Sequence, residues 1–255
     1  DADFMYGLAG NDGYMVDSSF DQIFENSGEG DFDTVYASVS YALGANIENL
    51  FLQGTGSFQA IGNAQSNTIT GNDGDNLMDG GGGIDGLIGG KGNDGYVIDN
   101  SFDQIVENAN EGDFDTVYTS VDYQLGANLE NVFMQGTANL AVYGNELSNV
   151  ITGNDGDNLL NGGLGIDGLI GGKGGDTYVI DNSFDQIVEY ANEGTDAVYA
   201  NVSYQLGENL ETLFLSGDAI QGYGNSGVNS IVGTSGNNGI DGRGGADVLT
   251  GNGGI

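Results

Sequence analysis

The feature that most constrains this chain is a period of nine residues. From Gly62, five consecutive rows of nine carry Asn or Asp at the sixth position and an apolar residue at the eighth: GNAQSNTIT, GNDGDNLMD, GGGGIDGLI, GGKGNDGYV and IDNSFDQIV. The same register returns over residues 144–188 and 224–250. Self-similarity at a short fixed period is typical of a solenoid, in which each repeat packs only on its neighbours.

A longer period contains the short one. Phe20, Phe102 and Phe184 are equally spaced along the chain, inside the similar segments VDSSFDQIFEN, IDNSFDQIVEN and IDNSFDQIVEY. We therefore expect one continuous solenoid segment over residues 1–255, part of a longer chain, made of three tandem repeats at approximately 1–83, 84–165 and 166–255.

The residue types of one row indicate its local structure. The glycine-rich first half suits a tight turn, because glycine reaches backbone conformations that are closed to other residues. The second half, with one apolar residue between two others, suits a very short strand with one inward side chain. Two rows then make one coil, with Ile69, Leu87 and Ile105 stacked on one face and Met78 and Tyr96 on the other. The predicted fold class is all-β: a right-handed parallel β-roll or β-helix solenoid built from nine-residue rows, two rows per coil.

The charge of the chain limits its partners. The chain contains 38 acidic residues and three basic residues, which gives a formal net charge of −35. This charge argues against nucleic acid as a partner and against anionic membranes. No apolar run reaches the length of a membrane span, so we expect no membrane insertion. The first residues do not form a signal peptide, so export would use a signal elsewhere.

Stacking the rows brings acidic side chains together. Sixth-position residues two rows apart become neighbours, as in the pairs Asp85 with Asp103 and Asp167 with Asp185. Two carboxylates about 5 Å apart repel by roughly 3 kcal/mol at an effective dielectric constant near 20. A few such pairs would offset the stability of a typical domain, so the predicted fold requires a counter-ion between coils.

Calcium is the counter-ion that these residue types favour. It takes six to eight oxygen ligands in relaxed geometry, and each turn offers carbonyl oxygens beside a carboxylate. The chain contains no His and no Cys, so zinc and copper lack their preferred ligands and no disulfide framework exists. Magnesium would demand a stricter octahedron. The predicted cofactor is therefore Ca²⁺, in several copies.

The rows GGGGIDGLI, GGKGNDGYV, GGLGIDGLI and GGKGGDTYV resemble the nonapeptide G-G-x-G-x-D-x-U-x of the RTX (repeats-in-toxin) family, in which U is a large apolar residue. The segments between such rows resemble the linking blocks of large RTX proteins. The resemblance implies a calcium-binding β-roll in which each ion lies between turns two rows apart, held by sixth-position Asp side chains and by carbonyl oxygens of the glycine-rich half.

The resemblance also implies the ligands. The sixth-position carboxylates of the regular rows are Asp85, Asp94, Asp103, Asp167, Asp176 and Asp185. The equivalent residues of looser rows are Asp12, Asp21, Asp33, Asp115, Asp196 and Asp247. The expected set is completed by Asn76, Asn158 and the carbonyl groups near Gly83, Gly92, Gly165 and Gly174.

Some rows depart from the pattern. Asn131 and Leu140 stand at the sixth position of their rows, so we expect residues 119–143 to continue the solenoid without metal. Asn67, Asn149 and Asn229 are expected to form a buried amide ladder in place of a metal site.

Nothing in the sequence indicates catalysis. Paired carboxylates can hydrolyse glycosides, but here the same carboxylates are needed as ligands. We therefore expect no enzyme, but a calcium-binding structural region of a bacterial secreted or cell-surface RTX protein, such as an adhesin stalk, a surface layer or an extracellular filament. Neighbouring copies, end to end or side by side, are a further expected partner. The alternative is a carrier module of a secreted enzyme, such as a protease, a lipase or an alginate epimerase.

Overall fold

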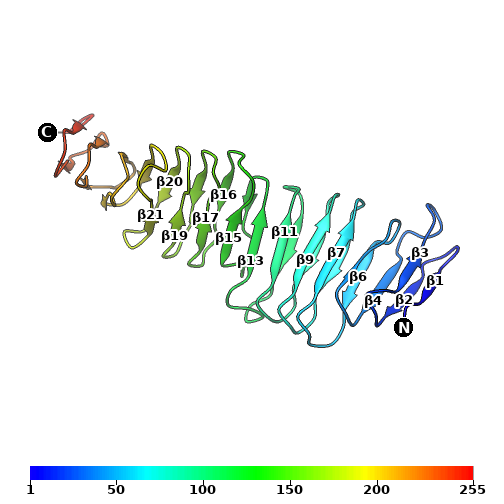
Figure 1. Cartoon of the computed structure of the whole chain (residues 1–255). Coiled ribbons are helices and arrows are strands. Elements are labelled where there is room, and N and C mark those ends of the chain that lie inside the picture. The colour runs from blue at the N-terminus through cyan, green and yellow to red at the C-terminus, as the bar shows by residue number, and fades with distance from the viewer. Residues whose placement is uncertain (255) are drawn as a thin grey trace. The chain divides into compact units, whose positions relative to one another are not determined.

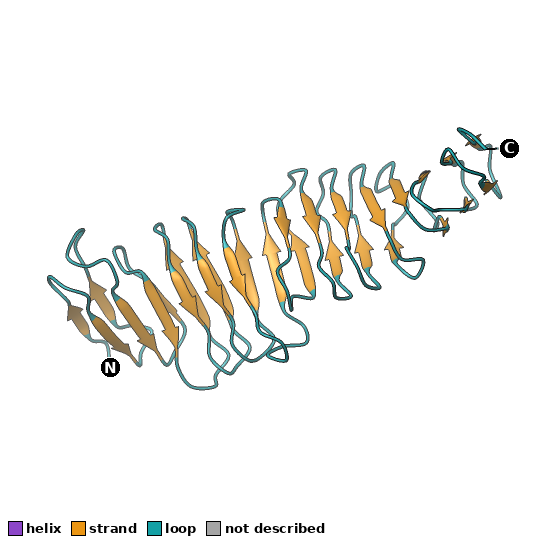
Figure 2. Cartoon of the chain, turned by 180° about the vertical axis from the view of Figure 1, so that it is seen from behind, coloured by secondary structure: helices purple, strands orange, loops and turns teal. Residues whose placement is uncertain are grey.

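The computed structural model describes residues 1–254, which contain 28 strands joined by turns and longer loops and no helix (Figures 1 and 2). No helix that could cross a membrane is therefore present in the described residues. The chain divides into two compact units. The first comprises residues 1–121 with 126–130, and the second comprises residues 122–125 with those from 131 onward.

The first unit is a parallel β-solenoid of thirteen strands. Strands alternate between two sides of the coil. One side holds the sheet β12-β10-β8-β6-β4-β2, and the other holds the pair β1-β3 and the run β11-β9-β7-β5 with β13 beside β11. The strands are β1 Phe4–Tyr6, β2 Gly13–Val16, β3 Gln22–Phe24, β4 Thr34–Ala37, β5 Tyr41–Ala42, β6 Asn49–Leu52, β7 Gln59–Asn63, β8 Thr68–Thr70, β9 Leu77–Gly81, β10 Gly86–Ile88, β11 Gly95–Ile98, β12 Gln104–Val106 and β13 Thr116–Thr119.

The second unit repeats this architecture. One side is the sheet β14-β16-β18-β20-β22-β24-β26-β28, and the other holds β15-β17-β19-β21 and β23-β25-β27. The strands are β14 Tyr123–Gln124, β15 Asn131–Met134, β16 Ala141–Tyr143, β17 Val150–Thr152, β18 Leu159–Asn161, β19 Gly168–Ile170, β20 Thr177–Ile180, β21 Gln186–Val188, β22 Ala197–Ala200, β23 Tyr204–Gln205, β24 Thr212–Leu215, β25 Gln221–Tyr223, β26 Ser230–Val232, β27 Gly239–Asp241 and β28 Val248–Thr250.

The core of each unit is a set of apolar ladders, as the nine-residue period predicts. Leu87 on β10 pairs in register with Ile69 on β8 and Ile105 on β12, and Met78 on β9 pairs with Tyr96 on β11. Four of these side chains are fully buried, and Ile105 is half-buried. The parallel solenoid with two rows per coil is thereby confirmed.

Coil length is not constant within a repeat. In the regular rows each strand pairs with the strand two rows away, but Gly13 on β2 pairs with Thr34 on β4, and Thr34 pairs with Asn49 on β6. A coil longer than two rows is thus followed by a coil shorter than two rows. In the second unit the long coil, from Thr177 to Ala197, has lost one residue. The loop absorbs this deletion because the strands keep their register.

The first glycine of a row is required by the close approach of the next coil. A Cβ on Gly62 or Gly144 would fall on the carbonyl oxygen of the residue two rows later, Gly80 or Gly162. Backbone in this position cannot retreat without breaking the parallel ladder. Glycine at the first position therefore permits the coil spacing that brings the sixth-position side chains together.

Candidate metal centres

The sixth-position carboxylates connect successive coils. One oxygen of each accepts a hydrogen bond from the backbone N–H of the sixth residue one coil earlier. Asn67 N donates to Asp85 Oδ1 at 2.7 Å, and Asp85 N donates to Asp103 Oδ1 at 3.0 Å. Asn149 N and Asp167 N donate in the same way to Asp167 and Asp185, at 2.8 and 3.0 Å. The predicted neighbours Asp85 with Asp103 and Asp167 with Asp185 are confirmed. In each pair, a backbone N–H group of one residue donates to the carboxylate of the other.

The second oxygen of most of these carboxylates has no hydrogen-bond partner. Nine buried side-chain oxygens of the described residues are in this state, and all belong to carboxyl groups: Oδ2 of Asp12, Asp33, Asp85, Asp94, Asp167 and Asp176, and Oε2 of Glu25, Glu107 and Glu189. A buried charged oxygen without a partner is costly, because its hydration is lost and nothing replaces it. A bound cation or a proton would therefore stabilise these oxygens.

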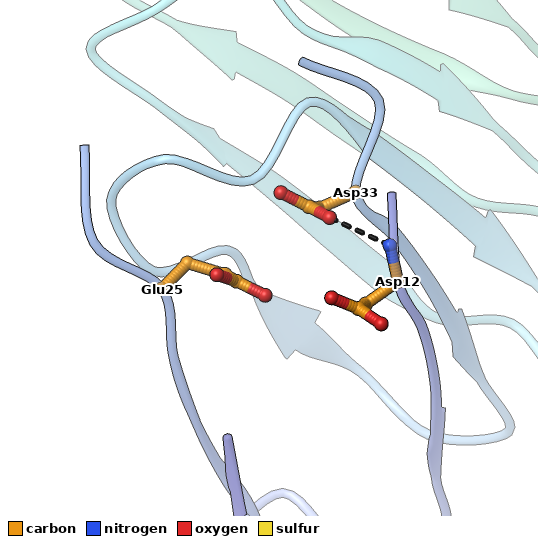
Figure 3. Close-up of side chains that lie close together, drawn as sticks. All are labelled: Asp12, Glu25 and Asp33. Atoms are coloured by element: carbon orange, nitrogen blue, oxygen red, sulfur yellow. Dashed lines mark hydrogen bonds between the residues drawn. The ribbon is translucent and has the colours of Figure 1, made fainter. Parts of the chain in front are cut away.

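Three acidic clusters form where the long coil begins and ends. Each contains two Asp residues and one Glu residue: Asp12, Glu25 and Asp33 in the first, Asp94, Glu107 and Asp115 in the second, and Asp176, Glu189 and Asp196 in the third. Within each cluster, carboxylate oxygens of the three residues lie within 4.8 Å of one another. All three residues are buried in the second and third clusters. Figure 3 shows the side chains of the first cluster pointing toward a common centre.

The local sequence explains how a Glu reaches the interior. In the second cluster, Asp94 directly precedes β11, Glu107 directly follows β12 and Asp115 directly precedes β13. Glu107 stands two rows after Gly89, at the first position of its row, which glycine occupies in regular rows. A Cβ on Gly89 would fall on Glu107 Oε1, Tyr96 Oη and Asp94 Oδ2. The missing side chain of Gly89 thus leaves the space in which this cluster assembles.

A tyrosine completes each cluster. Tyr14, Tyr96 and Tyr178 donate their hydroxyl groups to Oε1 of Glu25, Glu107 and Glu189, respectively. Tyr96 and Tyr178 are buried core residues, as their apolar eighth position predicts. Each hydroxyl group thus holds one Glu oxygen, while the other Glu oxygen has no hydrogen-bond partner.

Burial raises the pKa values of these acids. It raises the pKa of Glu107 to about 8, with a further rise from Asp115 and Asp94, and the Tyr96 hydrogen bond opposes the rise. Burial and the neighbouring Asp115 charge likewise raise the pKa of Asp94 to about 7. In the third cluster, burial raises the pKa values of Glu189 and Asp176 to about 8 and 7. Without a cation, the clusters therefore favour protonation close to neutral pH.

Backbone carbonyl groups approach the same clusters. The carbonyl oxygen of Gly92 and Oδ2 of Asp115 both converge on Gly112, where a Cβ would collide with them. The carbonyl oxygen of Gly174 converges with Asp196 on Gly194 in the same way. Carboxylate and carbonyl oxygens without nitrogen or sulfur are the ligands of hard cations such as Ca²⁺. The donor set and the unpartnered buried oxygens therefore fit calcium.

The remaining predicted residues lie in the turns with different surroundings. Asp21, Asp103 and Asp185 accept backbone hydrogen bonds at both oxygens. Asp247 accepts from Asn229 N at 2.9 Å. The carbonyl groups of Gly83 and Gly165 accept from the side-chain amides of Asn100 and Asn182. Asn76 and Asn158 use their own amide groups to bond Asn72 and Asn154 Oδ1, at 3.2 and 3.1 Å.

Sequence reasoning missed the glutamates. Glu25, Glu107 and Glu189 are absent from the predicted ligands because the nine-residue pattern reserves their position for glycine. A second set consists of Glu48, Glu130 and Glu211, which accept from the backbone N–H groups of Asp33, Asp115 and Asp196 at 2.8 to 2.9 Å. Their recurrence once in each of the three long repeats was a signal that they share a role.

Comparison with known families agrees with this donor set. Three stretches of the chain, residues 61–96, 143–178 and 223–255, match the family model of the RTX calcium-binding nonapeptide repeat, which spans four copies of the repeat. These three stretches are RTX-type calcium-binding repeats. The cofactor of the chain is accordingly Ca²⁺, in several copies. The first two matched stretches contain the four regular rows that carry Asp85, Asp94, Asp167 and Asp176.

One curated relative is similar to part of this chain. The endo-1,3-1,4-beta-glycanase ExsH of Rhizobium meliloti (strain 1021) is 45% identical over 67 residues, which is 26% of this chain and 14% of that protein. The shared stretch therefore covers a small part of the glycanase.

Proposed function

We propose that this RTX chain is a structural element of a secreted or cell-surface bacterial protein, such as an adhesin stalk, a surface layer or an extracellular filament, and that calcium drives its folding. The observation that carries the proposal is the set of nine buried carboxylate oxygens without a hydrogen-bond partner. They lie at repeated places in the turns and have no feature of a single catalytic site. The proposal includes no catalytic activity for the chain itself.

Folding is coupled to calcium because the metal binds only the folded chain. An unfolded chain keeps its carboxylates hydrated and far apart, whereas the folded coils bring them within 4.8 Å of each other. A cation that binds the folded form alone stabilises that form by mass action. Extracellular calcium-binding modules bind their ions at roughly millimolar calcium. Calcium at that concentration would fold the chain, whereas the much lower calcium concentration of the cytosol would not. This coupling would keep the chain extended until it has left the cell.

The hydrodynamic radius of the purified chain tests this function. We expect a large radius in EGTA at pH 8, a marked decrease when calcium is added to millimolar concentration, and no comparable decrease with magnesium at the same concentration, because Mg²⁺ requires a stricter geometry. A radius that is the same in EGTA and in calcium would refute calcium-driven folding.

A second candidate function is the carrier module of a secreted enzyme. It is favoured by the stretch shared with the R. meliloti protein, whose name describes a glycanase. In that case the segment would serve the export or refolding of an attached catalytic domain. Fusion of the chain to a reporter enzyme distinguishes the two: a carrier module raises the calcium-dependent recovery of reporter activity after denaturation, whereas a stalk leaves that recovery unchanged.

A further inference from the structure

The turns of this solenoid include two kinds. Four turns carry Gly at the second position and Asp at the sixth, and we call them the acid turns: residues 80–85, 89–94, 162–167 and 171–176. Five others carry Asn at both positions, and we call them the amide turns: residues 62–67, 71–76, 144–149, 153–158 and 224–229. In these nine turns Gly at the second position accompanies Asp at the sixth, and Asn accompanies Asn, whereas turns 233–238 and 242–247 carry the pairs Thr with Asn and Arg with Asp.

In the amide turns, side-chain amides donate to the carbonyl groups of the preceding coil. Asn63 Nδ2 donates to Gly44 O at 2.7 Å and to Ile47 O at 2.8 Å. Asn67 Nδ2 donates to the same Ile47 carbonyl at 2.9 Å. Two amide groups thus supply several N–H donors to carbonyl oxygens that point into the turn.

The same bonds recur in the second unit. Asn225 Nδ2 donates to Gly207 O and Leu210 O at 2.6 and 2.8 Å, and Asn229 Nδ2 donates to Leu210 O at 2.9 Å. Amide closure of the turn is therefore a property of the Asn pair and is not confined to one repeat.

The acid turns lack these donors. Their second residue cannot carry an amide, because a Cβ on Gly81 would fall on the carbonyl oxygen of Asn63, and the φ angle of Gly81 is +76°. Their sixth residue is a carboxylate, which only accepts hydrogen bonds when ionised. Each of the four acid turns accordingly contains a buried Asp Oδ2 without a partner, and none of the unpartnered oxygens found among the described residues belongs to an amide turn.

We propose that the residue pair at positions two and six decides whether a turn takes calcium: a Gly and Asp pair binds an ion, and an Asn and Asn pair replaces the ion with amide protons. Both the bound ion and the amide N–H groups place positive charge beside inward-facing carbonyl oxygens. Under this rule Asn76 and Asn158 are not calcium ligands, because their turns are already closed. The inference rests on the proposed calcium-driven folding, since it divides the turns into those that depend on the metal and those that do not.

The rule is tested by converting an amide turn into an acid turn. The double variant Asn63→Gly with Asn67→Asp, made in the full chain, is expected to bind one calcium ion more than the wild type when the metal content of the calcium-saturated protein is measured. Its thermal midpoint is expected to lie below that of the wild type at low calcium and to recover at saturating calcium. The matched control Asn67→Ala removes the amide without adding a carboxylate, so its midpoint should stay low at every calcium concentration.

The reverse change completes the test. Asp85→Asn is expected to bind one ion fewer than the wild type. The rule is overturned if the double variant binds no additional ion, if saturating calcium does not restore its midpoint, or if Asp85→Asn keeps the wild-type ion count. A wild-type chain that folds fully without calcium would instead refute the proposed function, so the two failures are distinguishable.

Discussion

At the scale of single residues, the buried glutamates carry the strongest chemical signal in this chain. Glu107 lies in a cluster of three buried acids, with one oxygen held by Tyr96 and the other unpartnered. A side chain in this state is stable only if it is protonated or bound to a cation. The two alternatives make different predictions for substitution and for pH.

Glu107→Gln should weaken calcium binding at its cluster by roughly tenfold or more, because one charged ligand is replaced by a neutral one of the same shape. Calcium-titration calorimetry measures the change. Glu146→Gln is the matched control, because Glu146 is exposed and belongs to none of the acidic clusters. Equal effects of the two substitutions would show that the cluster does not bind the ion.

The raised pKa values also set the pH dependence of the metal-free chain. Burial raises the pKa of Glu107 from 4.5 to about 8 and that of Asp94 from 3.8 to about 7, so the folded form binds protons that the unfolded form has released. This contribution to stability is complete below pH 4 and is lost as the pH rises toward 8. In EGTA we therefore expect more β signal at pH 5 than at pH 8 in far-ultraviolet circular dichroism. The opposite trend would contradict the burial of these acids.

At the scale of strands, each coil contributes few inward side chains, so each ladder position matters. Leu87 on β10 is fully buried between Ile69 and Ile105, whereas Leu77 on β9 is 37% exposed on the outer side of the coil. Removing a buried leucine side chain leaves a cavity that the neighbouring backbone cannot fill.

Leu87→Ala should therefore lower the free energy of unfolding in saturating calcium by about 2 to 5 kcal/mol. Leu77→Ala should lower it by about 1 kcal/mol or less, as is usual at partly exposed sites. Chemical denaturation of both variants gives the comparison. Similar losses for the two variants would mean that the ladder is not the core of the solenoid.

The sequence predicts the regular rows well and the linking segments poorly. The ladder of Ile69, Leu87 and Ile105 follows from the nine-residue period, because each row fixes the register of the row two places later. That rule fails in the linking segments, where a long coil is followed by a short one. The inward position of Glu107 depends on space left by Gly89 in the neighbouring coil, and this contact cannot be read from one row.

At the scale of the whole molecule, the acidic surplus and the thin apolar core of each unit have one explanation. A chain with a net charge of −35 gains little from thin apolar ladders alone, and its self-repulsion opposes compaction. Calcium ions bound in the turns would both add the missing stability and neutralise the negative charge of the carboxylates. The amide turns would set how many ions are needed.

The most direct test is a calcium titration of the EGTA-treated chain at pH 8, followed by far-ultraviolet circular dichroism. We expect little β signal before calcium is added and a cooperative rise to a full parallel-β spectrum as the turns fill, because the buried carboxylates tolerate each other only with a cation between them. A full β spectrum in EGTA at this pH, unchanged by calcium, would contradict the account.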